Sequence, residues 1–329
     1  MYYLDSSHIA SLPLDWPALT TTIRHAAAAV SNGTYVQPLK PYLRFGDPVN
    51  RIIAMPAYIG EGFDVAGIKW IASFPNNIKK GILRANSVTI LNEAATGVPF
   101  CIINSPLVSG IRTAAVSGLI LEEVTRYRSP EKRFRVGITG FGPIGRLHLQ
   151  MVDALLGERV TAYDIYDVNG VETDSIPTHL KEKVTVCNNY ETAFNDADIF
   201  ITATVATKRY ITGKPVQGSL QLNVSLRDYD SSIRQHINRM LVDNWEEVCR
   251  ENTDIHCMHE AGLLQQEDTL DLADIFGGNR LADLRPDETV MFNPMGMAIF
   301  DMAIAHYFYH YAREMKTGIA LGETLATEA

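Results

Sequence analysis

The chain has 329 residues, of which 46% are hydrophobic and 20% charged, and its formal net charge is −9. This length and apolar content suffice for two domains with buried cores and exclude an intrinsically disordered chain. The acidic balance, without any block of Lys and Arg, argues against a nucleic-acid-binding surface.

The first residues and the cysteines lead us to expect a cytoplasmic protein. The first residues, Met1–Asp5, lack a basic segment followed by an apolar one, and no apolar run is long enough to span a membrane. The four cysteines show no C-x-x-C spacing, which is typical of reduced thiols. Cys257 lies near two histidines, but no second ligand pair accompanies it, so we predict no metal site.

The first third of the chain is predicted to form a separate sheet. Four runs rich in β-branched residues suggest strands, and the last two flank a hairpin signal at 92–97. We expect a largely antiparallel sheet within residues 1–105, with strands at 51–55, 65–71, 87–91 and 100–103. Ser105 or Ser109 can then begin a helix that runs to about Arg126 and links the two domains.

Residues 134–145 combine a short apolar run with the spacing G-x-G-x-x-G, and a helical pattern follows. In such a loop Gly140 allows a tight turn, Gly142 lets backbone amides approach a pyrophosphate, and Gly145 lets the helix pack on the strand. The helix start, with Pro143 and Ile144, attracts the anion. The alternative is an ordinary strand-turn-helix whose glycines serve only the turn.

A second strand is predicted at 159–163, ending in Asp164. A carboxylate about 20 residues past the glycines can bind a ribose 2′-hydroxyl and repel a 2′-phosphate. This position therefore favours NAD over NADP.

From residue 134 to about 295, strand-like runs alternate with helical segments, which is typical of a doubly wound parallel sheet. A long amphipathic helix begins after Gly296 and is expected to return to the first domain. We therefore predict an α/β protein: a NAD-binding Rossmann domain at 119–297, and a mixed, largely antiparallel substrate and dimerisation domain at 1–118 with 298–329.

Several cations stand among apolar or small residues of the first domain: Lys40, Arg44, Lys69 and Arg84. Such cations are costly unless they are solvated or paired with an anion. Lys69 is flanked by bulky apolar neighbours, and Arg112 stands in the predicted first turn of its helix beside Thr113 and other small residues that allow close approach of a ligand. We predict that these cations bind substrate carboxylates.

Polar residues at the ends of later strands are candidates for the cofactor and for catalysis, since ligands of open α/β sheets bind beyond the carboxyl ends of the strands. Asp228 follows the strand that ends at Ser225 and is the predicted general acid or base. The alternative is an aspartate that caps a helix or closes a turn. The other predicted cofactor contacts are Thr204, Val205, Ser225, Asn293 and Met295.

Taken together, these motifs resemble the ornithine cyclodeaminase/μ-crystallin family over nearly the whole chain. The resemblance rests on 67–70, 111–115, the glycine loop, 223–228 and 293–299. It implies a homodimer of two-domain subunits with substrate held between the domains. It also implies that Lys69 and Arg44 bind a substrate carboxylate, that Arg112 lies near both carboxylate and nicotinamide, and that Asp228 is the catalytic acid. Lys69 is the second residue that we expect to be catalytic.

Segments 36–44, 51–56 and 293–299 resemble one branch of the family, which supplies 2,3-diaminopropionate for siderophores or peptide antibiotics. That resemblance implies NAD-dependent oxidation of N-((2S)-2-amino-2-carboxyethyl)-L-glutamate and hydrolysis of the imine to 2-oxoglutarate and L-2,3-diaminopropionate. A substrate with three carboxylates would suit the additional cations Lys40 and Arg84. Tyr229–Ile233 departs from the Pro/Gly/Lys-containing stretch of ornithine cyclodeaminases, which puts ornithine cyclisation in doubt. The alternatives are an ornithine cyclodeaminase, an alanine or imino-acid dehydrogenase, and a non-catalytic binding protein.

Overall fold

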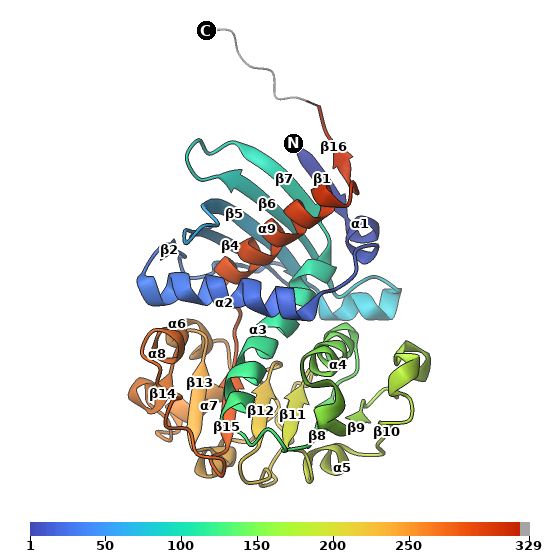
Figure 1. Cartoon of the computed structure of the whole chain (residues 1–329), viewed down its shortest axis with the longest axis vertical. Helices are drawn as coiled ribbons and strands as arrows, with labels where there is room; N and C mark the ends of the chain where they lie inside the picture. Colours follow the sequence, from blue (N-terminus) through green and yellow to red (C-terminus); the bar gives the residue numbers. More distant parts are fainter. Residues whose placement is uncertain (323–329) are drawn as a thin grey trace. The chain divides into compact units, whose positions relative to one another are not determined.

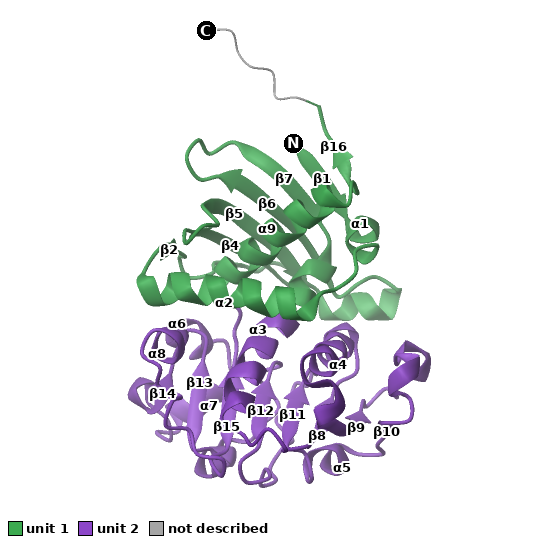
Figure 2. Ribbon diagram, in the orientation of Figure 1, with its two compact units in different colours: residues 1–112, 297–329 green, residues 113–296 purple. Residues whose placement is uncertain are grey.

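The computed structural model describes residues 1–322, and the chain divides into two compact units (Figure 1). The first unit comprises Met1–Arg112 and the chain from Met297 onward, and the second comprises Thr113–Gly296 (Figure 2). Each unit has its own sheet, one mixed and one parallel, so the predicted α/β class is confirmed.

The sheet of the first unit has the strand order β16-β1-β7-β6-β5-β4-β2, and β3 pairs with β4. All pairs are antiparallel except β1 with β7, which is parallel. Its strands are β1 (Tyr2–Asp5), β2 (Tyr35–Val36), β3 (Tyr42–Leu43), β4 (Arg51–Ile59), β5 (Val65–Ser73), β6 (Ala85–Glu93), β7 (Pro99–Asn104) and β16 (Ile319–Ala320).

Helices cover one face of this sheet, and the alternation of side chains shows which face it is. Helix α9 (Ala298–Glu314) packs on β4, β5 and β6, and α2 (Trp16–Asn32) packs against α9 (Figure 1). Residues that alternate along β4, such as Met55 and Ile59, are buried beneath these helices. The short helix α1 (Ser6–Ala10) completes this group, and α3 (Pro106–Arg126) carries the chain into the second unit.

The sequence-based prediction missed α2 and β1. Asp15 caps α2 by accepting a hydrogen bond from the Ala18 amide at 2.9 Å, and the helix ends at Gly33, whose φ is +68°. All four strands predicted for the first domain are present. Helix α3 begins at Pro106, so Arg112 lies in the second turn of the helix rather than in its predicted first turn.

The second unit contains one parallel sheet in the order β10-β9-β8-β11-β12-β15-β13-β14. The order reverses between β8 and β11, which is where open α/β sheets bind ligands. Its strands are β8 (Phe134–Thr139), β9 (Val160–Tyr166), β10 (Val184–Val186), β11 (Ile199–Thr202), β12 (Leu220–Asn223), β13 (Arg239–Val242), β14 (Thr269–Leu270) and β15 (Val290–Asn293). Its helices are the second part of α3, α4 (Pro143–Leu156), α5 (Tyr190–Phe194), α6 (Trp245–Val248), α7 (Asp254–Glu260) and α8 (Leu272–Phe276).

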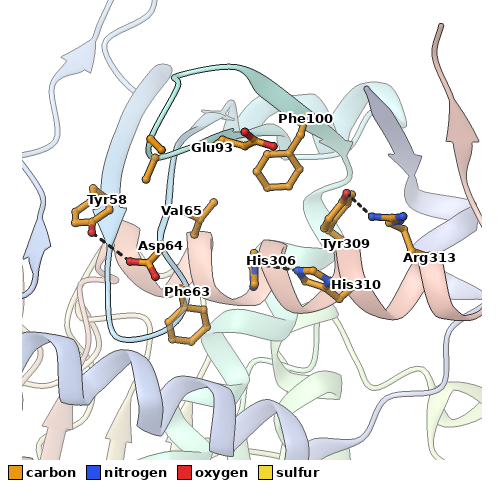
Figure 3. A pocket seen from close by; sticks show the side chains of 12 residues that line it. Tyr58, Phe63, Asp64, Val65, Glu93, Phe100, His306, Tyr309, His310 and Arg313 are labelled. Carbon is orange, nitrogen blue, oxygen red and sulfur yellow. Dashed lines mark hydrogen bonds between the residues drawn. The ribbon is translucent and has the colours of Figure 1, made fainter. Parts of the chain in front are cut away.

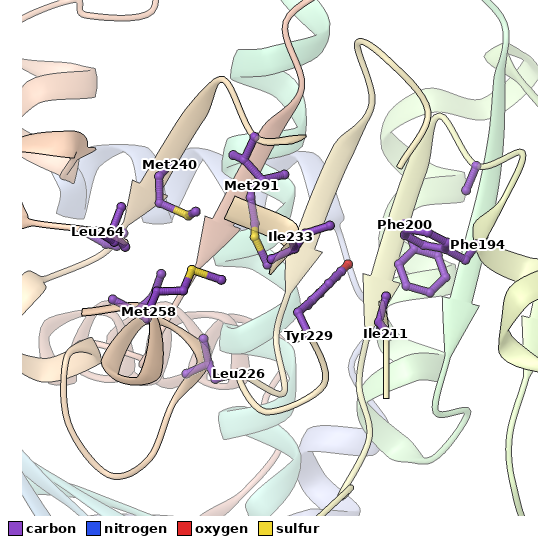
Figure 4. Packing of buried hydrophobic residues seen from close by; sticks show 14 of the residues in the cluster. Phe194, Phe200, Ile211, Leu226, Tyr229, Ile233, Met240, Met258, Leu264 and Met291 are labelled. Carbon is purple, nitrogen blue, oxygen red and sulfur yellow. The ribbon is translucent and has the colours of Figure 1, made fainter. Parts of the chain in front are cut away.

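A buried cluster beside this sheet anchors the turn that carries Asp228. Leu226 and Tyr229, on either side of that turn, both pack into the cluster with Met258 and Ile233 (Figure 4). The fixed apolar anchors therefore hold the backbone of the turn in place. In residues 1–322, no helix combines the length and apolar character needed to cross a bilayer.

Candidate functional site

Two of the predicted cations meet on one carboxylate that the sequence analysis missed. Asp301 of α9 contacts the Lys69 Nζ at 2.8 Å through one oxygen and the Arg112 Nε at 2.8 Å through the other. Lys69 also donates to the Ser109 hydroxyl at 3.2 Å. These three charged side chains come from β5, α3 and α9, and each is no more than 6% exposed.

Lys40 belongs to the same charged group. It is 4% exposed, and its charge acts on Lys69. Burial lowers the pKa of Lys69 to about 7, opposed by the charge of Asp301 and reinforced by Arg112 and Lys40. Burial by itself would raise the pKa of Asp301, but the charges of Arg112 and Lys69 hold it below its usual value. Two cations, Lys69 and Arg112, thus share one carboxylate, and a bound anion would balance the remaining positive charge.

The other two predicted cations lie at the end of the sheet where β4 begins. Arg44 follows β3 on an exposed loop, and its guanidinium carbon lies 5.3 Å from the centre of the Tyr42 ring. Arg84 precedes β6 and is half-buried. The structure therefore brings Lys40, Lys69 and Arg112 together and places Arg44 and Arg84 at the end of the same sheet.

A hollow of about 690 Å³ in the first unit does not contain any of the predicted site residues. It lies over α9 and the β6–β7 hairpin, where Phe100, Tyr309 and Phe63 line it with the imidazoles of His306 and His310 (Figure 3). The Nε2 atoms of these two histidines are 3.0 Å apart, and burial lowers the pKa of His306 to about 4. The cation group on β5 and α3 is separate from this hollow.

The glycine loop of the second unit has the geometry that a dinucleotide requires. Gly140 has a φ of +85°, and a Cβ there would lie 2.5 Å from the Ala203 carbonyl oxygen. A Cβ on Gly145 would lie 2.1 Å from the Gly140 oxygen, whereas one on Gly142 would meet nothing within 4 Å. Gly142 is the N-cap residue of α4, which begins with Pro143 and Ile144, and no side chain caps the first amides of the helix. The uncapped amides at an open position fit a pyrophosphate.

Asp164 does not stand where the sequence placed it. Strand β9 continues to Tyr166, and Asp164 is buried in its middle, where Arg135 of the adjacent β8 contacts it at 2.5 and 3.0 Å. The first carboxylate after the strand is Asp167, and it accepts a hydrogen bond from the Phe141 amide of the glycine loop at 2.7 Å. Asp167 therefore occupies the strand-end position that the ribose-binding argument requires.

Asp228 is fully buried and surrounded by hydroxyl groups at the strand ends. The Thr204 hydroxyl donates to one of its carboxylate oxygens and the Ser225 hydroxyl to the other. The Tyr210 hydroxyl interacts with the same carboxylate, and burial together with the charge of Asp228 raises the pKa of that phenol well above its usual value. Thr204 and Ser225, which are also predicted to contact the cofactor, both contact the predicted acid.

A second aspartate holds the backbone of the Asp228 turn. Asp254 accepts hydrogen bonds from the amides of Asp228 and Tyr229, each at 3.2 Å, and from Arg209 at 2.7 Å. Leu226 in this turn has a φ of +64°, a conformation that costs a branched residue about 1–2 kcal/mol. The hydrogen bond from the Asp254 amide to the Leu226 carbonyl, at 2.7 Å, helps to hold it.

Of the remaining predicted cofactor contacts, Val205 is exposed and Asn293 is buried. The side-chain oxygen of Asn293 accepts a hydrogen bond from the Asn223 side chain at 2.8 Å, and its side-chain nitrogen donates to the Leu241 carbonyl at 3.2 Å. The Asn293 side chain therefore links neighbouring strands. The Asp243 carboxylate accepts hydrogen bonds from the backbone amides of Met295 at 3.0 Å and Gly296 at 2.6 Å. Within the described part of the chain, no group of three metal-ligating side chains occurs.

Comparisons with known proteins agree with this architecture. The model of the ornithine cyclodeaminase/mu-crystallin family matches residues 10–316. The chain is 31% identical to the N-((2S)-2-amino-2-carboxyethyl)-L-glutamate dehydrogenase of Staphylococcus aureus over 91% of both proteins, and 24% identical to a Bacillus cereus Delta(1)-pyrroline-2-carboxylate reductase over 91% of this chain and 94% of that one.

Among solved structures, the Delta(1)-pyrroline-2-carboxylate reductase of Thermococcus litoralis, in complex with NADH and L-proline, shares the fold. Its TM-score is 0.86 at 23% identity, covering 98% of this chain and all of that one. Because the family model spans nearly all of the sequence, the chain belongs to the ornithine cyclodeaminase/mu-crystallin family.

Proposed function

We propose that the protein oxidises N-((2S)-2-amino-2-carboxyethyl)-L-glutamate with NAD⁺ and releases 2-oxoglutarate and L-2,3-diaminopropionate, for siderophore or peptide antibiotic biosynthesis. The observation that carries the proposal is the buried pair of cations, Lys69 and Arg112, that share the single carboxylate of Asp301. Such an excess of positive charge suits a substrate rich in carboxylates. The similarity to the Staphylococcus aureus dehydrogenase supports the choice of substrate.

The chain is an NAD-dependent oxidoreductase of this family. Residues that fit the cofactor are Gly140, Gly142 and Gly145 with the start of α4 for the pyrophosphate, and Asp167 for the adenosine ribose. When bound, NAD⁺ supplies the acceptor for the hydride.

The residues of this chain would then bind the substrate and move protons. Lys69 and Arg112 would hold a carboxylate of the glutamate part, and Asp301 fixes both cations for this role. Removal of hydride from the glutamate Cα leaves a C=N bond, and addition of water to it gives the ketone and the free amine. Asp228, with its hydroxyl partners Thr204 and Ser225, would take the proton from the attacking water and return it to the departing amine.

The proposal is tested by mixing purified protein with NAD⁺ and the conjugate and measuring NADH, 2-oxoglutarate and diaminopropionate. Equal amounts of the three are expected. Ornithine, proline and alanine serve as competing substrates in parallel reactions. Faster turnover of any of these, or proline and ammonia from ornithine, would contradict the proposed substrate, and NAD binding without turnover of any substrate would favour a non-catalytic binding protein.

We also propose that the protein forms a homodimer through the uncovered face of the first sheet. Side chains on this face are half-buried or exposed and form adjacent cross-strand rows: Pro56, Ile68, Ile90 and Ile102 in one, and Ala54, Trp70 and Val88 in the next. Trp70 is 43% exposed. A contiguous apolar surface of this kind suits a second copy of the same chain. Light scattering that shows a dimer for the wild-type protein and a monomer for Trp70→Lys would support this. A wild-type protein that is monomeric, or a variant that remains a dimer, would refute it.

A further inference from the structure

A second group of cations lies around Tyr42, at the end of the first sheet where β4 begins. The guanidinium carbons of Arg44 and Arg51 lie 5.3 and 5.6 Å from the centre of the Tyr42 ring. Arg51 is half-buried, and its Nε is buried without any hydrogen-bond acceptor among residues 1–322. A buried guanidinium N–H that lacks an acceptor is costly, and a carboxylate would satisfy it.

The strand register places Arg51 on the same face of the sheet as Lys69. Arg51 pairs with Ser73 and Met55 pairs with Lys69, so the two cations are separated by four residues along the strands. Side chains two and four residues apart point to one face, and four residues correspond to about 13 Å. Tyr42 pairs with Ile53 and therefore lies on this face as well.

Burial on this face decreases from the middle of the sheet toward its end. Met55 and Lys69 are buried, whereas Ile53, Arg51 and Ser73 are only half-buried. A ligand held at Lys69 can therefore extend along the strands toward Arg51.

We infer that Arg51 binds a second, distal carboxylate of the substrate and so selects dicarboxylic amino-acid skeletons over monocarboxylic ones. The inference rests on the proposed function, since it assigns Lys69 and Arg112 to the first carboxylate. Arginine presents two N–H groups to a carboxylate at once, and the contact with the Tyr42 ring holds the guanidinium at this end of the sheet before the ligand arrives. Arg44, on the same ring, adds positive charge to this subsite.

The test compares two ligands of equal chain length, 2-oxoglutarate and 2-oxopentanoate, of which only the first has a distal carboxylate. Their Kd values are measured by calorimetry with NADH present, for the wild-type protein and for Arg51→Gln, Arg51→Lys and Arg313→Gln. Arg313 is the matched control, since it also lies over a tyrosine, Tyr309, at 5.5 Å, but outside the Lys69 face.

The wild-type protein is expected to bind 2-oxoglutarate about 10- to 100-fold more tightly than 2-oxopentanoate, as a charge-assisted hydrogen bond would give. Arg51→Gln should remove this preference and leave 2-oxopentanoate binding unchanged, Arg51→Lys should retain part of it, and Arg313→Gln should retain all of it. Equal binding of the two ligands by the wild-type protein, or an equal loss for both in Arg51→Gln, would overturn the inference. A preference that depends on Arg51, without oxidation of the conjugate, would support the subsite and refute the proposed reaction.

Discussion

Replacing Asp301 by Asn removes the negative charge that Lys69 and Arg112 share, at nearly constant volume. Removing one partner of a buried ion pair costs about 3–5 kcal/mol, because the other partner is left as an uncompensated charge. Lys69 can avoid much of this cost, since its pKa is already about 7 and falls further without Asp301. Arg112 cannot lose its proton, so it carries the cost. We therefore expect the lower end of the range, a loss of about 3 kcal/mol in the free energy of unfolding.

Urea denaturation at neutral pH, followed by tryptophan fluorescence, measures this loss. The control is Asp287→Asn, which removes one partner of the exposed Arg285 pair and should change stability by less than about 1 kcal/mol. Asp301→Asn should also weaken binding of 2-oxoglutarate, because the two cations lose their fixed positions. If Asp301→Asn is as stable as the wild-type protein and binds the ligand equally well, the shared carboxylate does not organise the site.

Three further outcomes are expected. Asp228→Asn should retain NAD binding and lower kcat by about 10²- to 10⁴-fold, the usual contribution of a general acid or base, and an unchanged kcat would exclude that role. Asp167→Ala should weaken NAD binding and relax the discrimination against NADP, whereas Asp164→Ala should chiefly lower stability by leaving Arg135 without its partner. Weaker NAD binding in Asp164→Ala and unchanged binding in Asp167→Ala would show instead that Asp164 is the ribose ligand. The pKa of Lys69 is about 7, and its ammonium form holds the carboxylate, so the Kd of 2-oxoglutarate should increase as pH rises through about 7. Lys69→Arg stays charged and should flatten this pH dependence. An equally steep dependence in that variant would contradict the role of Lys69 in binding the carboxylate.

The sequence predicted most of the fold because its signals are local. The glycine loop, the alternating strands of the second unit and the hairpin between β6 and β7 each depend on neighbouring residues. Helix α2 also had local signals, namely the Asp15 cap and Gly33, and could have been predicted from them. Strand β1 could not, since it pairs in parallel with β7, about a hundred residues away.

The site was predictable in its residue types but not in its pairing. Lys69 and Arg112 stand out as cations among apolar or small residues, but their partner Asp301 lies in a helix whose pattern indicates packing alone, 189 residues beyond Arg112. Asp164 was predicted because the strand was expected to end at that residue, whereas β9 continues to Tyr166, an end that cannot be located from sequence. The pairing of Arg135 with Asp164 depends on the register of β8 and β9, which only the folded sheet reveals.

Hydride transfer from the substrate carbon is measured with the conjugate that carries deuterium at the glutamate Cα. After reaction with NAD⁺, mass spectrometry of the cofactor should show deuterium in the NADH, in an amount equal to the 2-oxoglutarate and diaminopropionate released. NADH without deuterium, or no reaction with a protein shown to bind NAD⁺, would contradict the claim that this chain oxidises the carbon–nitrogen bond of an acidic amino-acid conjugate.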